Sequence, residues 1–415
     1  MSEATALAND LQNDPTIGTE TIADLLFTVT HRSESGRHTE QYYARGVNFW
    51  RDILPEKIYF GLLGKQAGDK MTLPLPAGLV YPSHEPRQVL TIPMSRFRGK
   101  TPNGTTVSPQ PGRYYPKGLL EGLAGIFPQN AEPFRCIRVD TSQITVDMNH
   151  PMAAVDTRLT VDVQDVRIKG AERGGTSVDW IGSLTTGPGM QIRHDGNRTD
   201  FFSQAPFERS DESPDDRFYR LPRFVNHLDD RAIGLIGALY GSLLRPGGRV
   251  LDLMSSWVSH LPPELKPAEL TGLGMNRSEL AANDRLDRAV VHDLNRNPML
   301  PFDSGSFDAV VCTVSVEYMT RPLDVFEEIS RVLKAGGTFV VTFSNRWFPP
   351  KVVRIWRELH DFERVGLVLE YFRNAGGFTA LETLSIRGYP RPLHDRYFPE
   401  LTLADPVYAV WGRKP

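Results

Sequence analysis

The sequence from Val250 to Lys334 decides the fold of the C-terminal half. It opens with the apolar run Val250-Leu-Asp-Leu253, and two further short apolar runs follow at Leu270–Gly274 and Ala289–Val291. The helix-period segment Leu323–Leu333 comes after them. Short apolar runs that alternate with helical segments are typical of βαβ units, which build a parallel sheet and bind ligands at the carboxyl ends of its strands. We therefore predict an α/β domain with a ligand site at that edge of the sheet.

Two motifs within this region are specific. Leu300-Pro-Phe-Asp-Ser-Gly-Ser-Phe-Asp308 leads into the apolar run Ala309–Thr313, and Arg331-Val-Leu-Lys-Ala-Gly-Gly337 closes the helical segment. Their residue types and spacing resemble the class I S-adenosylmethionine (SAM) methyltransferases, in particular a type 11-like branch. The resemblance covers about residues 218–415. It implies a Rossmann-like domain of seven strands, the last of them antiparallel, with SAM as the cofactor.

The resemblance places SAM over the ends of the first two strands. The acid Asp252 opens the first loop, and Met254, Ser255 and Ser256 stand where the family uses glycines. The serine hydroxyls and backbone are then expected to meet the carboxylate of the methionine tail.

The end of the second strand is the other unusual part of the expected cofactor site. It reads Gly274-Met275-Asn276 where the family has a ribose-binding acid. Asn276 either replaces that acid as a neutral hydrogen-bonding partner or serves as the N-cap of the helix that follows.

The third and fourth strands complete the predicted cofactor site. Asp293, followed by Leu294, matches the family acid that binds the adenine amino group; the alternative is an acid in a surface turn. Thr313 and Ser315 lie at the end of the fourth strand, which is expected to face the methyl group.

Methyl transfer is an in-line displacement, so alignment and desolvation supply most of its acceleration. A base is needed only where the acceptor carries a proton at neutral pH. Glu317 and Tyr318 are the candidates for a base or for positioning the acceptor, with packing against the cofactor as the alternative. His260, after the first loop, is a further candidate.

The N-terminal part carries a second set of motifs. Gly68-Asp69 precedes a strand-like run, and the loop after that run ends in Tyr81. An Asn149-His150-Pro turn precedes the alternating run Leu159–Arg167. These features resemble the SlyD-type FKBP prolyl isomerases, which implies an α+β domain whose inserted flap lobe binds unfolded or proline-containing segments.

Whether this part is an active isomerase stays open in the sequence. Catalysis needs an apolar, aromatic-lined pocket. Tyr81 matches the family's loop tyrosine, and Trp50 is expected near the pocket floor. Thr39–Gly46 has no clear match to the family's Phe-Asp pair. The aromatic residues either form a catalytic pocket or belong to the core of a domain that binds without catalysing.

The chain of 415 residues is too long for one ordinary core. We divide it into an FKBP-like domain at 1–169 with an inserted lobe at about 97–150, a linker at 170–217, and a methyltransferase domain at 218–415. The linker contains apolar side chains, so we expect much of it to pack on a neighbouring domain. These side chains are Trp180, Ile181, Met190, Phe201, Phe202 and Phe207.

Composition excludes several classes of partner. A net charge of −3 without a basic stripe argues against nucleic acid, and no apolar run reaches the ~20 residues that cross a bilayer. The start, Met1–Asp10, lacks the features of a secretory signal. Two separated cysteines and ten scattered histidines predict neither a disulfide nor a metal site. We expect a cytoplasmic protein.

The leading hypothesis is a SAM-dependent methyltransferase fused to an FKBP-like domain, with a small molecule or a protein side chain as methyl acceptor. A proline-containing peptide is a second candidate partner, on the FKBP-like domain. The alternative is a non-catalytic methyltransferase-like binding module beside a peptide-binding chaperone or isomerase domain. The altered first loop favours the alternative, whereas the presence of both Asp252 and Asp293 favours the enzyme.

Overall fold

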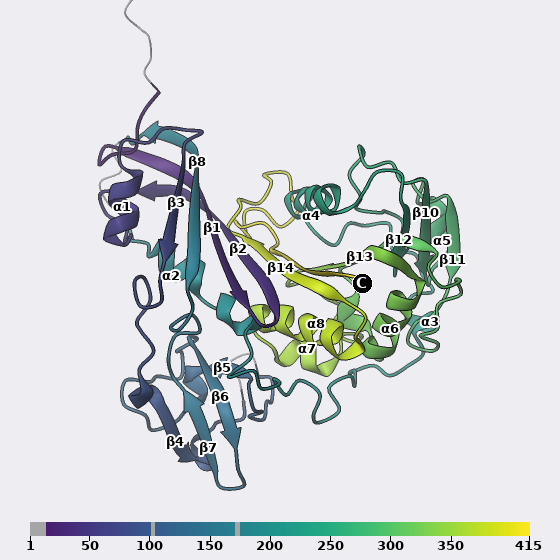
Figure 1. The fold of residues 1–415 in the computed structure, drawn as a ribbon, viewed down its shortest axis with the longest axis horizontal. Coiled ribbons are helices and arrows are strands. Elements are labelled where there is room, and N and C mark those ends of the chain that lie inside the picture. Colours follow the sequence, from purple (N-terminus) through teal and green to yellow (C-terminus); the bar gives the residue numbers. More distant parts are fainter. Residues whose placement is uncertain (1–13, 101–103, 171–174) are drawn as a thin grey trace, which may run out of the picture.

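The computed structural model describes residues 14–100, 104–170 and 175–415, and within them eleven strands form one continuous sheet (Figure 1). The segment Met1–Asp10, for which the sequence predicts no secretory signal, lies outside these residues. The strands are β1 (Thr21–Ser33), β2 (Gly36–Asn48), β3 (Lys70–Leu75), β8 (Thr157–Ile168), β9 (Arg249–Leu253), β10 (Glu269–Gly274), β11 (Arg288–Val291), β12 (Phe307–Thr313), β13 (Leu333–Phe343), β14 (Thr379–Arg387) and β15 (Val407–Arg413).

The helices and a smaller sheet surround this large sheet. The α-helices are α1 (Glu56–Leu62), α2 (Trp180–Thr185), α3 (Asp215–Phe218), α4 (Asp230–Leu243), α5 (Arg277–Ala282), α6 (Pro322–Val332), α7 (Arg354–Glu358) and α8 (Asp361–Ala375). The smaller sheet, in the order β4-β7-β6-β5, consists of β4 (Val89–Pro93), β5 (Tyr114–Pro116), β6 (Pro133–Val139) and β7 (Gln143–Asp147). Short 3-10 turns lie at Pro86–Gln88, Met94–Arg96, Lys117–Leu119, Pro188–Gln191 and Val316–Tyr318.

The C-terminal strands lie in the order β11-β10-β9-β12-β13-β15-β14. Strands β9 to β13 pair in parallel, and β15 is antiparallel to both of its neighbours. The chain builds outward from β9 to β11 and then returns to β12 on the other side of β9. That reversal opens a crevice at the carboxyl ends of β9 and β12, where doubly wound sheets bind ligands.

Alternate side chains of β9 point into two different cores, because successive residues of a strand face opposite sides of the sheet. Leu251 and Leu253 pack in one cluster with residues of α6 and α8, such as Phe326 and Tyr371. Val250 packs in another cluster with α4. Helices α4 and α8 therefore cover opposite faces of the sheet (Figure 1).

The N-terminal part of the sheet has the order β2-β1-β8-β3. Its apolar face forms a core with α1, in which Phe27, Ile58 and Val161 are fully buried. The smaller sheet has a core of its own around Phe134 and Ile144.

The two parts join edge to edge, because β2 pairs in parallel with β14. At this junction the Arg387 guanidinium contacts the buried Glu40 carboxylate at 2.7 Å. The buried Arg113–Glu363 ion pair at 3.0 Å also connects the parts, and Arg193–Glu370 at 2.5 Å connects the segment between them to α8. Nothing in the sequence predicted this pairing between the two expected domains.

The segment after residue 175 packs as expected of a linker with apolar anchors. Ile181 and Leu184 of α2 are buried in the N-terminal core, and Phe201 is buried in the C-terminal one. The Trp180 indole N–H donates to Asp52 at 2.7 Å. Helix α2 therefore covers the apolar face of the N-terminal part.

The expectation for Trp50 is wrong. Its side chain is 58% exposed, and the Lys169 ammonium lies over its ring. Tyr81 is only 4% exposed; its hydroxyl bonds Thr157 at 3.1 Å and its ring stacks on His150.

Among the described residues, no helix is both long and apolar enough to cross a membrane.

Candidate active site

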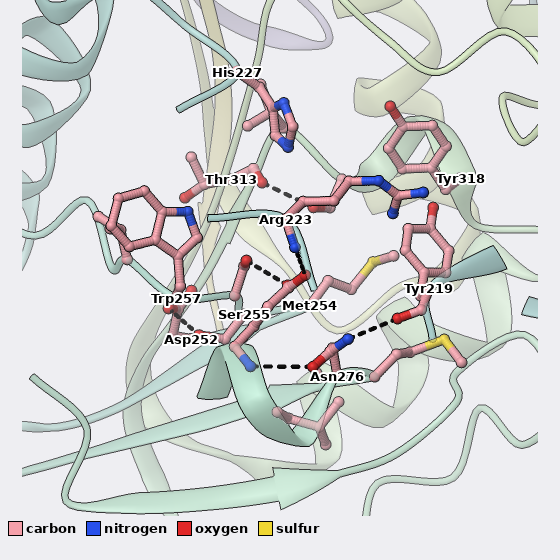
Figure 2. A pocket seen from close by; sticks show the side chains of 18 of the residues that line it. Tyr219, Arg223, His227, Asp252, Met254, Ser255, Trp257, Asn276, Thr313 and Tyr318 are labelled. Atoms are coloured by element: carbon pink, nitrogen blue, oxygen red, sulfur yellow. Dashed lines mark hydrogen bonds between the residues drawn. The ribbon is translucent and has the colours of Figure 1, made fainter. Parts of the chain in front are cut away.

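A cavity opens at the carboxyl ends of β9, β10 and β12, and Figure 2 shows it from close by. Every residue predicted to bind the cofactor lines it. These residues are Asp252, Met254, Ser255, Ser256, Gly274, Met275, Asn276, Asp293, Leu294, Thr313 and Ser315.

The first loop is held closed by its own serines. Ser255 and Ser259 both donate their hydroxyls to one oxygen of Asp252, each at 2.6 Å. Asn283 donates to Ser259 at 3.1 Å, which links the loop to the end of α5. Burial raises the pKa of Asp252 to about 6, against the lowering effect of the two hydroxyls. The loop without glycines is therefore ordered by side chains.

Met254 shows what the missing glycines cost. Its φ is +58°, in the left-handed region that residues with a Cβ seldom adopt. Such a conformation costs about 1–2 kcal/mol in a residue other than glycine, and it persists only where the surroundings enforce it. Val314, at the end of β12, has a φ of +42° and lines the same cavity. Two strained residues thus flank the site.

The structure explains why a glycine ends β10. A Cβ built on Gly274 would lie 2.1 Å from the backbone oxygen of Ser255, which crosses the end of this strand. The Ser255 N–H donates to Leu273 at 2.8 Å and keeps the loop in this position. An acid at residue 274 and this loop are therefore incompatible.

Asn276 is the N-cap of α5, one of its two predicted roles. Its side-chain oxygen accepts from the backbone N–H groups of Ser278 and Glu279. Its amide donates to the backbone oxygens of Tyr219 and Arg220 at 2.8 and 3.2 Å. Since both ends of the side chain have protein partners, the structure does not support the ribose-binding role.

Asp293 lies in a turn at the cavity wall. One of its oxygens accepts from the backbone N–H groups of Asn295 and Arg296. Its neighbour Leu294 is buried in the core beneath. At the end of β12, Thr313 bonds the Tyr240 hydroxyl at 2.7 Å, and Ser315 donates to the Thr313 backbone oxygen.

The three predicted catalytic residues separate into two groups. Tyr318 and His260 line the cavity, and the Tyr318 hydroxyl accepts from the Phe348 N–H at 2.8 Å. Burial lowers the pKa of His260 to about 4, which makes it a weak base. Glu317 does not line the cavity. It is 1% exposed, and burial raises the pKa of its carboxyl to about 8.

A segment that was not predicted from the sequence crosses the cavity. We call residues 219–228, between α3 and α4, the strap. Tyr219, Arg223 and His227 of the strap line the cavity, as do Trp257 of the first loop and Glu279 of α5. The strap has no regular secondary structure to predict, and its aromatic and charged residues were the available signal.

Comparison with known proteins agrees with this geometry. A family model described as a methyltransferase domain matches residues 256–341. A 66-residue stretch is 32% identical to a malonyl-[acyl-carrier protein] O-methyltransferase of Marinomonas sp. (strain MWYL1), over 16% of this chain and 24% of that protein. The C-terminal half resembles the SAM-dependent methyltransferases.

The N-terminal region matches a different enzyme class. It is 30% identical over 109 residues to the "Probable FKBP-type 16 kDa peptidyl-prolyl cis-trans isomerase" of Pseudomonas fluorescens, over 26% of this chain and 61% of that protein. The chain therefore spans about a quarter of one of these curated relatives and about three fifths of the other.

Solved structures of methyltransferases are also similar to this chain. A SAM-dependent methyltransferase of Thermotoga maritima is 16% identical, with a TM-score of 0.34, over 45% of this chain and 91% of that one. A SAM-dependent methyltransferase of Aquifex aeolicus is 16% identical, with a TM-score of 0.30, over the same two shares.

Proposed function

We propose that the C-terminal half is a catalytic SAM-dependent methyltransferase that binds its cofactor in the cavity at the ends of β9, β10 and β12. One observation carries the proposal. Residues chosen from four separate sequence segments all line a single cavity, at the switch point of a doubly wound sheet. The family model covers three of those segments completely and begins within the first one.

The residues present fit the cofactor. Asp252 and Asp293 both line the cavity, where Asp252 would meet the cationic end of SAM and Asp293 the adenine amino group. Bound SAM supplies an electrophilic methyl group. The chain's own task is to align it, exclude water and leave the acceptor in line with the methyl carbon.

Calorimetric titration of S-adenosylhomocysteine tests the proposal. We expect micromolar binding to the wild-type protein and binding at least about tenfold weaker in Asp293→Ala, because one lost hydrogen bond to a ligand is worth about 1.5 kcal/mol. Asp284→Ala is the matched control, since Asp284 is exposed and does not line the cavity. A folded wild-type protein that binds neither SAM nor S-adenosylhomocysteine would leave the non-catalytic alternative.

For the N-terminal part we propose binding and support without isomerase activity. Tyr81 is buried with its hydroxyl on Thr157, and Ile181 and Leu184 of α2 occupy the apolar face. A proline-containing peptide that binds on this face of the sheet, and not on the inserted lobe, would have to displace that helix. Acceleration of prolyl isomerisation in a protease-coupled peptide assay would contradict this proposal, with a reporter peptide in the absence of protein as the baseline.

A further inference from the structure

The Arg223 side chain is the unusual group of the cavity. Its guanidinium carbon lies over the rings of Phe218 and Phe348, at 4.6 and 5.2 Å from the centroids. One amino group donates to the Phe218 backbone oxygen at 3.1 Å. Figure 2 shows the guanidinium between the rings of Tyr219 and Tyr318.

Arg223 has no carboxylate within ion-pair distance in the part of the chain that the structure describes. Four described arginines with side chains at most 10% exposed each contact an acid at 3.0 Å or less, in the pairs Arg113–Glu363, Arg193–Glu370, Arg209–Asp215 and Arg391–Asp405. Arg135 and Arg285 are partly buried like Arg223 and also lack an acid partner among the described residues, but they donate to backbone oxygens and do not line this cavity. A half-buried guanidinium with free N–H donors is suited to a planar anion, which it can bind through two parallel hydrogen bonds.

The strap holds Arg223 in place before any ligand arrives. The Arg223 backbone N–H donates to Glu279 at 2.7 Å, and Asn276 donates to the Tyr219 oxygen at 2.8 Å. The Trp257 indole N–H donates to Val225 at 3.3 Å. Binding therefore costs little ordering of the backbone, which favours affinity.

The carboxylates that share the cavity with Arg223 are already engaged. Asp215 contacts Arg209 at 2.7 Å and Lys351 at 3.1 Å. Glu279 accepts from Ser256 and from the Arg223 backbone, and Asp252 accepts from Ser255 and Ser259. Asp293, which also lines the cavity, accepts from two backbone N–H groups. The Arg223 guanidinium therefore keeps N–H donors free for a ligand, among aromatic rings.

We infer that Arg223 binds a carboxylate of the methyl acceptor, so that the chain methylates a carboxylic acid with an apolar or aromatic body. The inference rests on the proposed function. A carboxylate oxygen would attack the methyl carbon of SAM, the C–S bond would break, and its electron pair would stay on sulfur. The products are a methyl ester and neutral-sulfur S-adenosylhomocysteine, and no proton moves.

A carboxylic acid acceptor needs no base. A carboxylate is ionised at neutral pH, so it needs no group to remove a proton. Glu317 lies outside the cavity, and His260 is a weak base. An alcohol acceptor, by contrast, would have to lose its proton to a base.

The methionine tail of SAM also carries a carboxylate. The experiment therefore distinguishes whether Arg223 binds the carboxylate of the acceptor or that of SAM. Benzoate and its neutral isostere benzamide are titrated into the protein loaded with S-adenosylhomocysteine, for wild type, Arg223→Gln and Arg220→Gln. Arg220 belongs to the same strap, but its side chain is exposed and does not line the cavity. Calorimetry reports the affinity of each probe and, in separate titrations, of S-adenosylhomocysteine.

We expect benzoate to bind wild type and Arg220→Gln at least about tenfold more tightly than benzamide does, because a charged, bidentate hydrogen bond is worth more than 1.4 kcal/mol. Arg223→Gln should remove this preference and leave the affinity for S-adenosylhomocysteine within about threefold. Two results would overturn the inference: equal binding of the two probes to wild type, or a tenfold loss of S-adenosylhomocysteine affinity in Arg223→Gln.

The same benzoate and benzamide titrations without S-adenosylhomocysteine keep the two proposals apart. Wild-type protein that prefers benzoate but does not bind S-adenosylhomocysteine would contradict the proposed function and support the carboxylate site. Protein that binds S-adenosylhomocysteine and ignores benzoate would contradict the carboxylate site alone.

Discussion

The two parts of the sheet use their apolar surfaces in different ways. In the N-terminal part, α2 of the same chain covers the face, and Leu184 is fully buried there. In the C-terminal part, the ends of β9 and β12 stay open as a cavity, which the strap crosses without filling. The N-terminal part thus covers its apolar face with a helix of the segment that follows it. The sheet that continues from it keeps its switch point free for ligands.

The largest expected effect on stability comes from removing one charge of the buried ion pair that joins the two parts. Glu363→Ala would leave the Arg113 guanidinium buried without its partner, in a site where both side chains are at most 2% exposed. An unpaired buried charge costs about 3–5 kcal/mol. We expect the free energy of unfolding to fall by that amount in urea titrations followed by circular dichroism.

Glu121→Ala is the matched control for this substitution. Glu121 pairs with Arg98 at 2.6 Å, but both side chains are about half exposed. Exposed pairs contribute about 1 kcal/mol or less. Equal effects of the two substitutions would show that the junction does not hold the two parts together.

A second change tests whether α2 belongs to the N-terminal core. Leu184→Ala removes a side chain with no exposed surface and should cost about 2–5 kcal/mol, the range for a leucine that leaves a cavity. Leu79→Ala, on the same part of the chain and 40% exposed, should change stability by about 0.5 kcal/mol or less. A small effect of Leu184→Ala would mean that α2 lies loosely on this face and that a peptide could replace it.

The sequence predicted the C-terminal fold and site much better than the junction. Periodicity located β9, β10 and β11, and the motif around Asp308 located β12, because both depend on local residue patterns. The pairing of β2 with β14 depends on two strands that are far apart in the chain, and neither strand shows its partner. The strap was missed for a similar reason: Arg223 reaches the cavity only because Asn276 and Glu279 hold residues 219–223 against α5.

Glu317 illustrates a different limit of sequence reasoning. Its position after the fourth strand predicted a side chain in the site, but the chain turns into a 3-10 helix at Val316–Tyr318 and buries it. Adjacent residues of this turn point to different places, so Tyr318 lines the cavity and Glu317 does not. Sequence spacing could not decide which of the two would face the ligand.

The boundary of the cavity can be tested through the titration of Glu317. Its carboxyl has an ordinary pKa of 4.5 when unfolded and a pKa raised by burial to about 8 in the folded protein. Between these values the folded state binds more protons, so the free energy of unfolding falls as the pH rises. From pH 6 to pH 8 we expect a fall of about 2 kcal/mol that Glu317→Gln lacks.

Glu327→Gln is the control, since Glu327 is exposed on α6. It should keep the wild-type pH dependence. If Glu317→Gln also kept it, the Glu317 carboxyl would be solvated, and the cavity would extend to this residue as the sequence predicted.

The smallest expected effect concerns the affinity of the open cavity for SAM. Burial raises the pKa of Asp252 to about 6, and the cationic end of SAM favours its ionised form. At pH 5 about a tenth of the protein has this carboxylate ionised, and at pH 7 about nine tenths, so the affinity should rise about tenfold. The ammonium and carboxylate of SAM do not titrate in this interval. Calorimetry at pH 5, 6 and 7 would give a flat profile for Asp252→Asn; the same rise in that variant would place the titrating group elsewhere and make Asp252 a residue that only orders the loop.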